Sequence, residues 1–262
     1  MIDTHSHIYD EAFDADFDAV VDRASAAGVD MFIMPGIDSS CHKRMMDCAA
    51  RLKQKARPAV GLHPTSVDDG WKKELAFVES RLGERGWTAI GEIGMDAFHS
   101  KAYMDEQEEV FRTQVIWACQ LGLPVIIHVR DAADRVFAVL DGLRRKGIVP
   151  SGVFHAFSGS IETYRRIRGY GGFKVGIGGV VTFKNASIAA TLKEIPLEDI
   201  LLETDAPWLA PVPYRGKRNE PAYMAIVAGK VAEIKGCDVA AVEKTTEENA
   251  INLFNIKKDT AV

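Results

Sequence analysis

The chain has 262 residues, a length that allows one or two domains and is typical of a single α/β barrel. Apolar residues make up 47% and charged residues 26% of the sequence, which excludes a disordered or collagen-like chain, and the net charge of −5 excludes a polycation. No stretch approaches the ~18 consecutive apolar residues of a membrane-spanning helix, so no membrane partner is expected.

Short apolar runs alternate with longer amphipathic segments along the whole chain. The predicted strands are residues 1–5, 30–35, 58–63, 88–92, 123–128, 152–156, 173–177 and 200–204. Most are continuously apolar, as is typical of parallel strands buried on both faces. Residues 16–27 and 106–121 show helical spacing of apolar side chains, and Gly28 and Gly122 end these helices. Eight strand–helix units over this length predict a single-domain (β/α)8 TIM barrel spanning residues 1–262.

An open, doubly wound sheet is the alternative architecture. It usually carries a glycine-rich phosphate turn after the first strand, where this chain has His5-Ser6-His7. The glycines of residues 176–179 lack the third glycine of the dinucleotide fingerprint. The barrel is therefore favoured.

The four cysteines have no C-x-x-C spacing and are too few for a disulfide scaffold. The sequence opens without the basic and apolar regions of a secretory signal. We expect free thiols and a cytoplasmic location.

Seven polar residues fall at or near the ends of predicted strands: His5, His7, His63, Glu92, His128, His155 and Asp205. In a barrel these strand ends meet at one rim, where active sites are built. Spacing by two places Ile126 and His128 on one strand face, and it predicts the same for Ile90 and Glu92. These polar groups are therefore expected to continue inward-pointing rows of side chains.

Several imidazoles with carboxylates form a ligand set for Zn, Mn, Fe or Ni, and Mg is possible where carboxylates and water dominate. A single histidine at a strand end is more often a structural residue, but the joint placement of these side chains favours a metal site. Six candidate ligands exceed the needs of one tetrahedral ion, so two ions that share a bridging carboxylate are predicted.

Six segments in chain order resemble motifs of the TatD family of metal-dependent deoxyribonucleases, which are amidohydrolase-like metal-hydrolase barrels. They are Met-Ile-Asp-Thr-His-Ser-His (1–7), Gly-Leu-His-Pro (61–64), Gly-Glu-Ile-Gly-Met-Asp (91–96), Ile-His-Val-Arg (127–130), Phe-His-Ala-Phe-Ser-Gly-Ser (154–160) and Leu-Glu-Thr-Asp-Ala-Pro-Trp-Leu-Ala-Pro (202–211). Ala97 and Ala156 depart from the family pattern, in which Tyr and Cys are frequent at these positions. Neither alanine is a proposed ligand, so the departures concern the fit of the substrate.

The resemblance implies a hydrolase with two divalent ions (Mg, Mn or Zn) that acts on DNA as a 3′-to-5′ exonuclease. The ligands that it implies are His5, His7 and Asp205 for one ion and His128 and His155 for the other, with Glu92 bridging both.

Three residues have expected roles beyond binding metal. Asp205 is the expected general base, because a carboxylate at the metal can accept the proton of an activated water. His63 is expected to contact the scissile phosphate, and a structural hydrogen bond is a near-equal alternative. Glu203 is expected to lie on the same strand face as Asp205 and to orient a metal-binding side chain without itself binding the metal.

Four basic residues are candidates for holding the DNA backbone: Arg130, Arg215, Lys217 and Arg218. Arg130 is favoured because it follows His128 by two residues, and ordinary solvent exposure is the alternative for the other three. Trp208 and Tyr214 are candidates for stacking on unpaired bases. For Trp208, packing against its own loop is the favoured alternative.

The predicted function is metal-dependent hydrolysis of DNA from a free 3′ end, with a preference for single strands and no protein partner implied. One alternative is hydrolysis of another ester or amide, such as the ester of a D-aminoacyl-tRNA, because the same ligands activate water for many electrophiles. Another is a catalytically silent binding protein.

Overall fold

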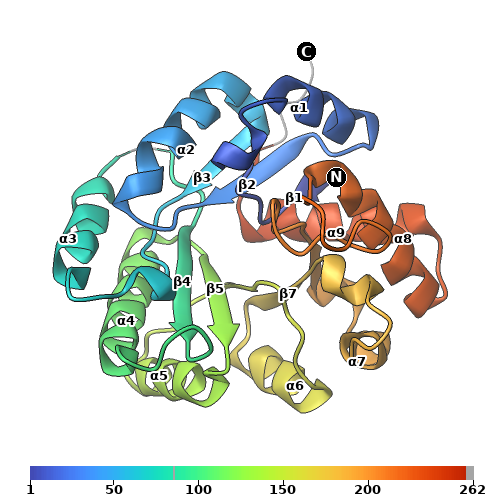
Figure 1. Cartoon of the computed structure of the whole chain (residues 1–262). Coiled ribbons are helices and arrows are strands. Elements are labelled where there is room, and N and C mark those ends of the chain that lie inside the picture. Colours follow the sequence, from blue (N-terminus) through green and yellow to red (C-terminus); the bar gives the residue numbers. More distant parts are fainter. Residues whose placement is uncertain (85, 258–262) are drawn as a thin grey trace.

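The structure is a computed structural model that describes residues 1–84 and 86–257. In this part of the chain, eight parallel strands form a central ring that is surrounded by nine α-helices (Figure 1). The strands are β1 (Ile2–Asp3), β2 (Met31–Pro35), β3 (Ala56–Ala59), β4 (Ile90–Asp96), β5 (Val125–Arg130), β6 (Gly152–Phe154), β7 (Phe173–Ile177) and β8 (Ile200–Leu202).

One α-helix follows each strand from β1 to β7, and two follow β8. The helices are α1 (Phe17–Ala26), α2 (Ser39–Leu52), α3 (Trp71–Arg81), α4 (Met104–Leu121), α5 (Ala133–Arg145), α6 (Ile161–Tyr170), α7 (Ile188–Glu194), α8 (Met224–Lys235) and α9 (Val239–Leu253). Gly122 ends α4 in the left-handed conformation, as predicted. None of the described helices is both long enough and apolar enough to cross a membrane.

Backbone hydrogen bonds connect the strands into the predicted (β/α)8 barrel. β1, β2 and β3 pair in one sheet and β4 to β8 in another, always in parallel. Isolated parallel bridges join the two sheets at both seams, between Ser6 and Ala206 and between Val60 and Ile90. The Gly91 N–H donates to the Val60 carbonyl at 2.9 Å across the second seam.

Two apolar layers hold the barrel together. Inside the ring, one cluster contains residues on or directly before every strand except β7: Ile2, Ile33, Ala59, Ala89, Ile126, Val153 and Leu201. Phe254 and Ile256, which follow α9, close this cluster, and Asn249 fixes α9 by donating to the carbonyl of Ile200 at 2.8 Å. A larger outer cluster packs the strands against the helices.

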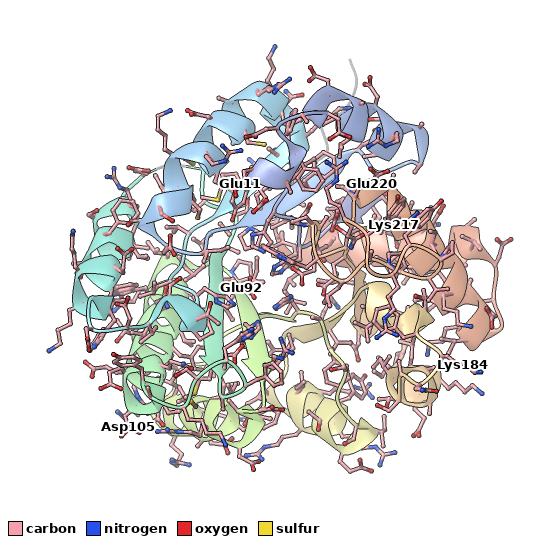
Figure 2. The ribbon with its side chains drawn as sticks, viewed as in Figure 1. Glu11, Glu92, Asp105, Lys184, Lys217 and Glu220 are labelled. Carbon is pink, nitrogen blue, oxygen red and sulfur yellow. The ribbon has the colours of Figure 1, made fainter. Side chains whose placement is uncertain are left out.

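The alternation of side chains is broken in β4. The prediction that Ile90 and Glu92 share a face is wrong, because the pairing register with β5 shifts between Ile90 and Ile93. Ile90 and Ile93 both pack in the outer cluster, whereas Glu92 lies among side chains at the centre of the ring (Figure 2). An irregular strand, rather than simple alternation, therefore brings Glu92 into the barrel.

Gly94 in β4 pairs with His128 in β5 and leaves no room for a side chain. Its φ is +144°, and a Cβ at this position would lie 1.9 Å from the carbonyl oxygen of His128. We expect Gly94→Ala to lower the free energy of unfolding by about 3 kcal/mol or more, because both the backbone conformation and the contact become unfavourable. Denaturant unfolding measures this, with exposed Gly169→Ala in α6 as the control, since a Cβ there meets nothing within 4 Å. The control should stabilise by up to about 1 kcal/mol, and native-like stability of Gly94→Ala would contradict the expectation.

Candidate metal centre

The ring's carboxyl end gathers the predicted polar residues. His5 and His7 follow β1, His155 follows β6 directly, and Asp205 lies three residues beyond β8. Glu92 and His128 lie within their strands, because β4 and β5 extend further than predicted, to Asp96 and Arg130.

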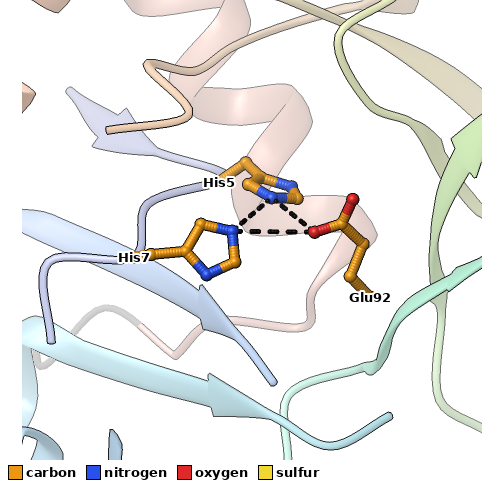
Figure 3. A group of neighbouring side chains, drawn as sticks. All are labelled: His5, His7 and Glu92. Atoms are coloured by element: carbon orange, nitrogen blue, oxygen red, sulfur yellow. Dashed lines mark hydrogen bonds and ion pairs between the residues drawn. The ribbon is translucent and has the colours of Figure 1, made fainter. Parts of the chain in front are cut away.

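The first group of ligand atoms contains His5, His7, Glu92 and Asp205. The Nε2 atoms of His5 and His7 are 3.1 Å apart, and Oε2 of Glu92 lies 3.1 Å from the first and 3.6 Å from the second (Figure 3). Oδ1 of Asp205 lies 3.6 Å from His5 Nε2 and 3.8 Å from His7 Nε2. These four side chains surround one small volume.

The second group surrounds the other oxygen of Glu92. Oε1 lies 2.7 Å from Nε2 of His155, 3.1 Å from Nδ1 of His128 and 3.3 Å from Nε2 of His63. Nδ1 of His128 and Nε2 of His155 are 3.3 Å apart. The two carboxylate oxygens of Glu92 therefore face two different sets of histidines.

The electrostatics of the centre keep Glu92 ionised. Burial alone raises the pKa of this carboxyl, but the surrounding histidines, above all His155, His63 and His5, hold the pKa well below its usual range. Burial lowers the pKa of His5 to about 3, so its imidazole is neutral and able to ligate a metal. Burial opposes protonation of His128 as well, but hydrogen bonds with Asp96 and Glu92 outweigh it and raise this pKa to about 9. A cation that binds His128 at this position displaces a proton.

Asp205 and His63 both line the cavity above the centre. Burial raises the pKa of Asp205 to about 7, because it outweighs the opposite effect of the nearby His155. The backbone of Asp205 adopts a φ of 57°, an uncommon conformation that an aspartate tolerates better than most residues. Nδ1 of His63 accepts from the Thr65 N–H at 3.2 Å, so a neutral His63 carries its proton on Nε2 and is a donor there.

Tyr9 supports the centre from behind His7, and it was not among the residues predicted from the sequence. Its hydroxyl donates its single proton to the carbonyl of Pro35 at 2.5 Å, so the oxygen accepts from Nδ1–H of His7 at 2.8 Å. Nε2 of His7 is consequently unprotonated and presents its lone pair to the first group of ligands. The only sign of this role in the sequence is a tyrosine two positions after His7. The carbonyl that orients its hydroxyl belongs to Pro35 in β2, which the local sequence does not indicate.

We expect Tyr9→Phe to weaken metal binding by about 10–100-fold, because the tautomer and orientation of His7 lose their support. Competition against a chromophoric chelator measures the dissociation constant. Tyr164→Phe is the matched control, since that hydroxyl is bonded to Asp199 at 2.5 Å on the outside of the barrel. Equal metal affinity in both variants would contradict this role for Tyr9.

Asp96 was also not predicted as a site residue, although it is the last residue of the motif at 91–96. Its Oδ2 lies 3.0 Å from Nε2 of His128 and 2.8 Å from Nδ1 of His99. Its side chain is fully buried. Asp96 therefore orients His128 from the side opposite Glu92.

Glu203, predicted to orient a ligand, is buried beside His155 but makes no hydrogen bond to it. Its Oε1 accepts from the Ala156 N–H at 2.5 Å and lies 3.8 Å from Nδ1 of His155. Burial raises the pKa of Glu203 well above its usual range. Gly176 leaves the necessary space, because a Cβ there would lie 2.0 Å from Oε2 of Glu203.

The four basic candidates occupy different places. Arg130 lines the cavity of about 900 Å³ above the ligand groups, whereas the other three do not appear in its described walls. Arg218 makes two hydrogen bonds to Asp16, at 2.7 and 2.8 Å, so the geometry does not support its predicted role on DNA. Arg215 lies over the ring of Phe183, and Lys217 lies away from Glu92 in Figure 2.

The two residues predicted to stack on bases, Trp208 and Tyr214, also lie in different surroundings. Trp208 lines the cavity, is 45% exposed and touches the His7 ring edge to face at 4.9 Å between centroids. Tyr214 is stacked on Tyr223 at 4.1 Å and is therefore already partnered.

The donor set fits divalent metal ions. Within residues 1–84 and 86–257, no lysine or arginine forms an ion pair with Glu92, Asp205 or Glu203, whose charged partners are all histidines. The Nε2 atoms of His5 and His7 are 3.1 Å apart. Two unprotonated imidazole nitrogens at this distance have no attractive interaction unless a proton or a metal ion lies between them. Buried carboxylates without cationic side chains and imidazoles with converging lone pairs are typical of a site for Zn, Mn or a similar ion.

The fold and the site together define a metal-dependent hydrolase on a (β/α)8 barrel. A family model described as TatD related DNase matches residues 2–255. The chain belongs to the TatD family.

Relatives and solved structures agree with this assignment. The "uncharacterized metal-dependent hydrolase YabD" of Bacillus subtilis is 38% identical over 98% of this chain and 99% of YabD. The "3'-5' ssDNA/RNA exonuclease TatD" of Cronobacter sakazakii is 35% identical over 97% of each chain. The crystal structure of YjjV, a TatD homologue from Escherichia coli, superposes with a TM-score of 0.90 at 30% identity, covering 98% of each chain.

Proposed function

We propose that this chain is a two-metal nuclease that removes nucleotides from the 3′ end of single-stranded DNA. The observation that carries the proposal is the position of Glu92, whose two oxygens face two separate sets of histidines at 2.7–3.6 Å. A carboxylate in this position can bridge two ions, and paired ions are suited to displacement at a phosphodiester.

The ligands follow from the two groups. His5, His7 and Asp205 would hold one ion, His128 and His155 the other, and Glu92 both. Bound ions supply an activated water and stabilise the oxygens of the reacting phosphate. Zn, Mn and Mg are the candidate ions.

The remaining roles belong to side chains of this chain. Asp205, whose pKa burial raises to about 7, accepts the proton of the attacking water. His63 donates from Nε2 to the phosphate, which agrees with the tautomer that Thr65 imposes. Arg130 binds a neighbouring phosphate from the cavity wall.

Three observations support a single-stranded substrate with a free end. The relative from Cronobacter sakazakii carries the name of a 3′-5′ ssDNA/RNA exonuclease. The candidate centre lies at the floor of a cavity, which an unpaired strand end enters more easily than the middle of a duplex. The net charge of −5 offers little surface for neutralising a long duplex.

Digestion of a 5′-labelled single-stranded DNA, with Mg, Mn or Zn added, tests the proposal. We expect a metal-dependent ladder that shortens from the 3′ end, together with a loss of at least about 100-fold in rate for Asp205→Asn. Asp47→Asn, an exposed change on α2, is the control and should retain the native rate. Absence of cleavage by a metal-loaded native protein would overturn the proposal and direct attention to esters such as aminoacyl-tRNA.

A further inference from the structure

A second cavity opens beside the candidate centre. It has a volume of about 610 Å³, which lies within the ~300–1,000 Å³ range of small-molecule sites. Its walls come from three segments: the residues after β4 up to the start of α4, the end of β5 with the first turns of α5, and the end of β6 with the following loop and α6. It shares Val129, His155, Ala156 and Ser158 with the larger cavity above the ligand groups, so the two spaces adjoin.

The walls of this side cavity are mainly apolar. Phe137, Phe154 and Phe157 contribute aromatic side chains, and Ala97, Ala133 and Ala156 are small enough to leave the space between them. A flat, apolar group fits such a pocket better than a solvated, charged one, because burying a charge without a partner is costly.

The charged groups around the side cavity also disfavour a phosphate inside it. Asp131 and Asp134 are exposed acids in its lining. The guanidinium of Arg135 is already bonded to Asp105 at 2.5 Å and to Glu108 at 3.0 Å. Lys101 is the other basic residue in the described lining, and it is exposed. A neutral ring whose amino groups can donate to carboxylates is therefore preferred over an anion.

The position of the side cavity relates it to the reaction. His155 lines both cavities, and its Nε2 lies 2.7 Å from Oε1 of Glu92. A group that occupies the side cavity is consequently adjacent to a phosphate held over the two ligand groups.

From this arrangement we infer that the side cavity is a nucleobase-binding subsite, which receives the base of the nucleotide next to the scissile phosphate. The inference rests on the proposed function, since it assigns the substrate group that the nuclease centre would hold. Base stacking on the aromatic walls would supply the binding, and the exposed carboxylates of Asp131 and Asp134 in the lining would favour bases that carry amino groups.

Filling the pocket from two different walls tests the inference. Ala97→Leu fills it from the end of β4, and Ala133→Leu fills it from the first turn of α5. Ala138→Leu is the matched control, because it makes the same change on an exposed position of α5 outside the lining. Two variants are used so that a folding defect in one does not decide the result.

The substrates are a single-stranded oligonucleotide and its copy with a base-free nucleotide beside the scissile bond. We expect the native, metal-loaded protein and Ala138→Leu to prefer the normal strand by about tenfold in kcat/KM. Both pocket variants should lose this preference while keeping the native rate on the base-free strand. Pocket variants that retain the preference would overturn the inference, as would a native protein that treats both strands alike.

A binding measurement separates this inference from the nuclease proposal. Calorimetric titration of the metal-loaded proteins with deoxyadenosine monophosphate and with deoxyribose 5-phosphate requires no turnover. We expect the nucleotide to bind the native protein and Ala138→Leu about tenfold more tightly than the pocket variants, and the sugar phosphate to bind all four alike. If neither strand is cleaved but this pattern appears, the subsite stands and the nuclease proposal fails; equal nucleotide affinity in all four proteins overturns the subsite.

Discussion

Glu92→Gln is expected to lower kcat/KM on single-stranded DNA by about a thousandfold or more and to reduce the bound metal from two ions to at most one. The amide keeps the shape of the side chain, but it loses the negative charge and one of the two ligand oxygens. The remaining oxygen can face only one group of histidines, so the other group loses its shared ligand. A loss of about 4 kcal/mol in transition-state stabilisation corresponds to this fall in rate.

Metal analysis and steady-state kinetics on the same preparations measure both effects. Glu79→Gln is the matched control, because Glu79 is exposed on α3 and should leave metal content and rate unchanged. A Glu92→Gln protein that binds two ions and cleaves DNA at the native rate would contradict the bridging role.

Removal of the metals is expected to lower the midpoint of thermal unfolding by about 5–10 °C for each ion lost. The folded chain brings the ligand atoms of two groups together, whereas an unfolded chain does not, so binding stabilises the folded state. At a free metal concentration 100 times the dissociation constant, one ion contributes about 2.7 kcal/mol, and each kcal/mol shifts the midpoint by about 2–4 °C in a protein of this size.

Calorimetric scans of protein treated with EDTA, and of the same protein after addition of Mn²⁺ or Zn²⁺, measure the shift. Glu92→Gln serves as the internal comparison, and its midpoint should respond less to EDTA because it binds fewer ions. If the midpoint of the native protein is the same with and without metal, the two groups do not form the sites described here.

The barrel and most of the centre were predictable because their signals are local. Continuous apolar runs indicate buried parallel strands, and strand ends in such a barrel meet at one rim. His5, His7, His155 and Asp205 therefore lie together, as predicted from their positions alone.

The features that were not predictable depend on contacts between distant segments. Glu92 lies inside the ring as predicted, but the irregular pairing of β4 with β5 that brings it there is not visible in the strand periodicity. Tyr9 fixes the tautomer of His7 through a carbonyl 26 residues away. Arg218 is hydrogen-bonded to Asp16, which is 202 residues away in the sequence. The sequence near Arg218 therefore could not show that its guanidinium is already occupied and less available to DNA.

A crystal structure of the protein grown with Mn²⁺, with anomalous scattering used to locate the ions, tests the central claim most directly. The account predicts two peaks about 3.5–4 Å apart on opposite oxygens of Glu92, one beside His5 and His7 and the other beside His128 and His155. A single peak, or ions that do not contact Glu92, would contradict it.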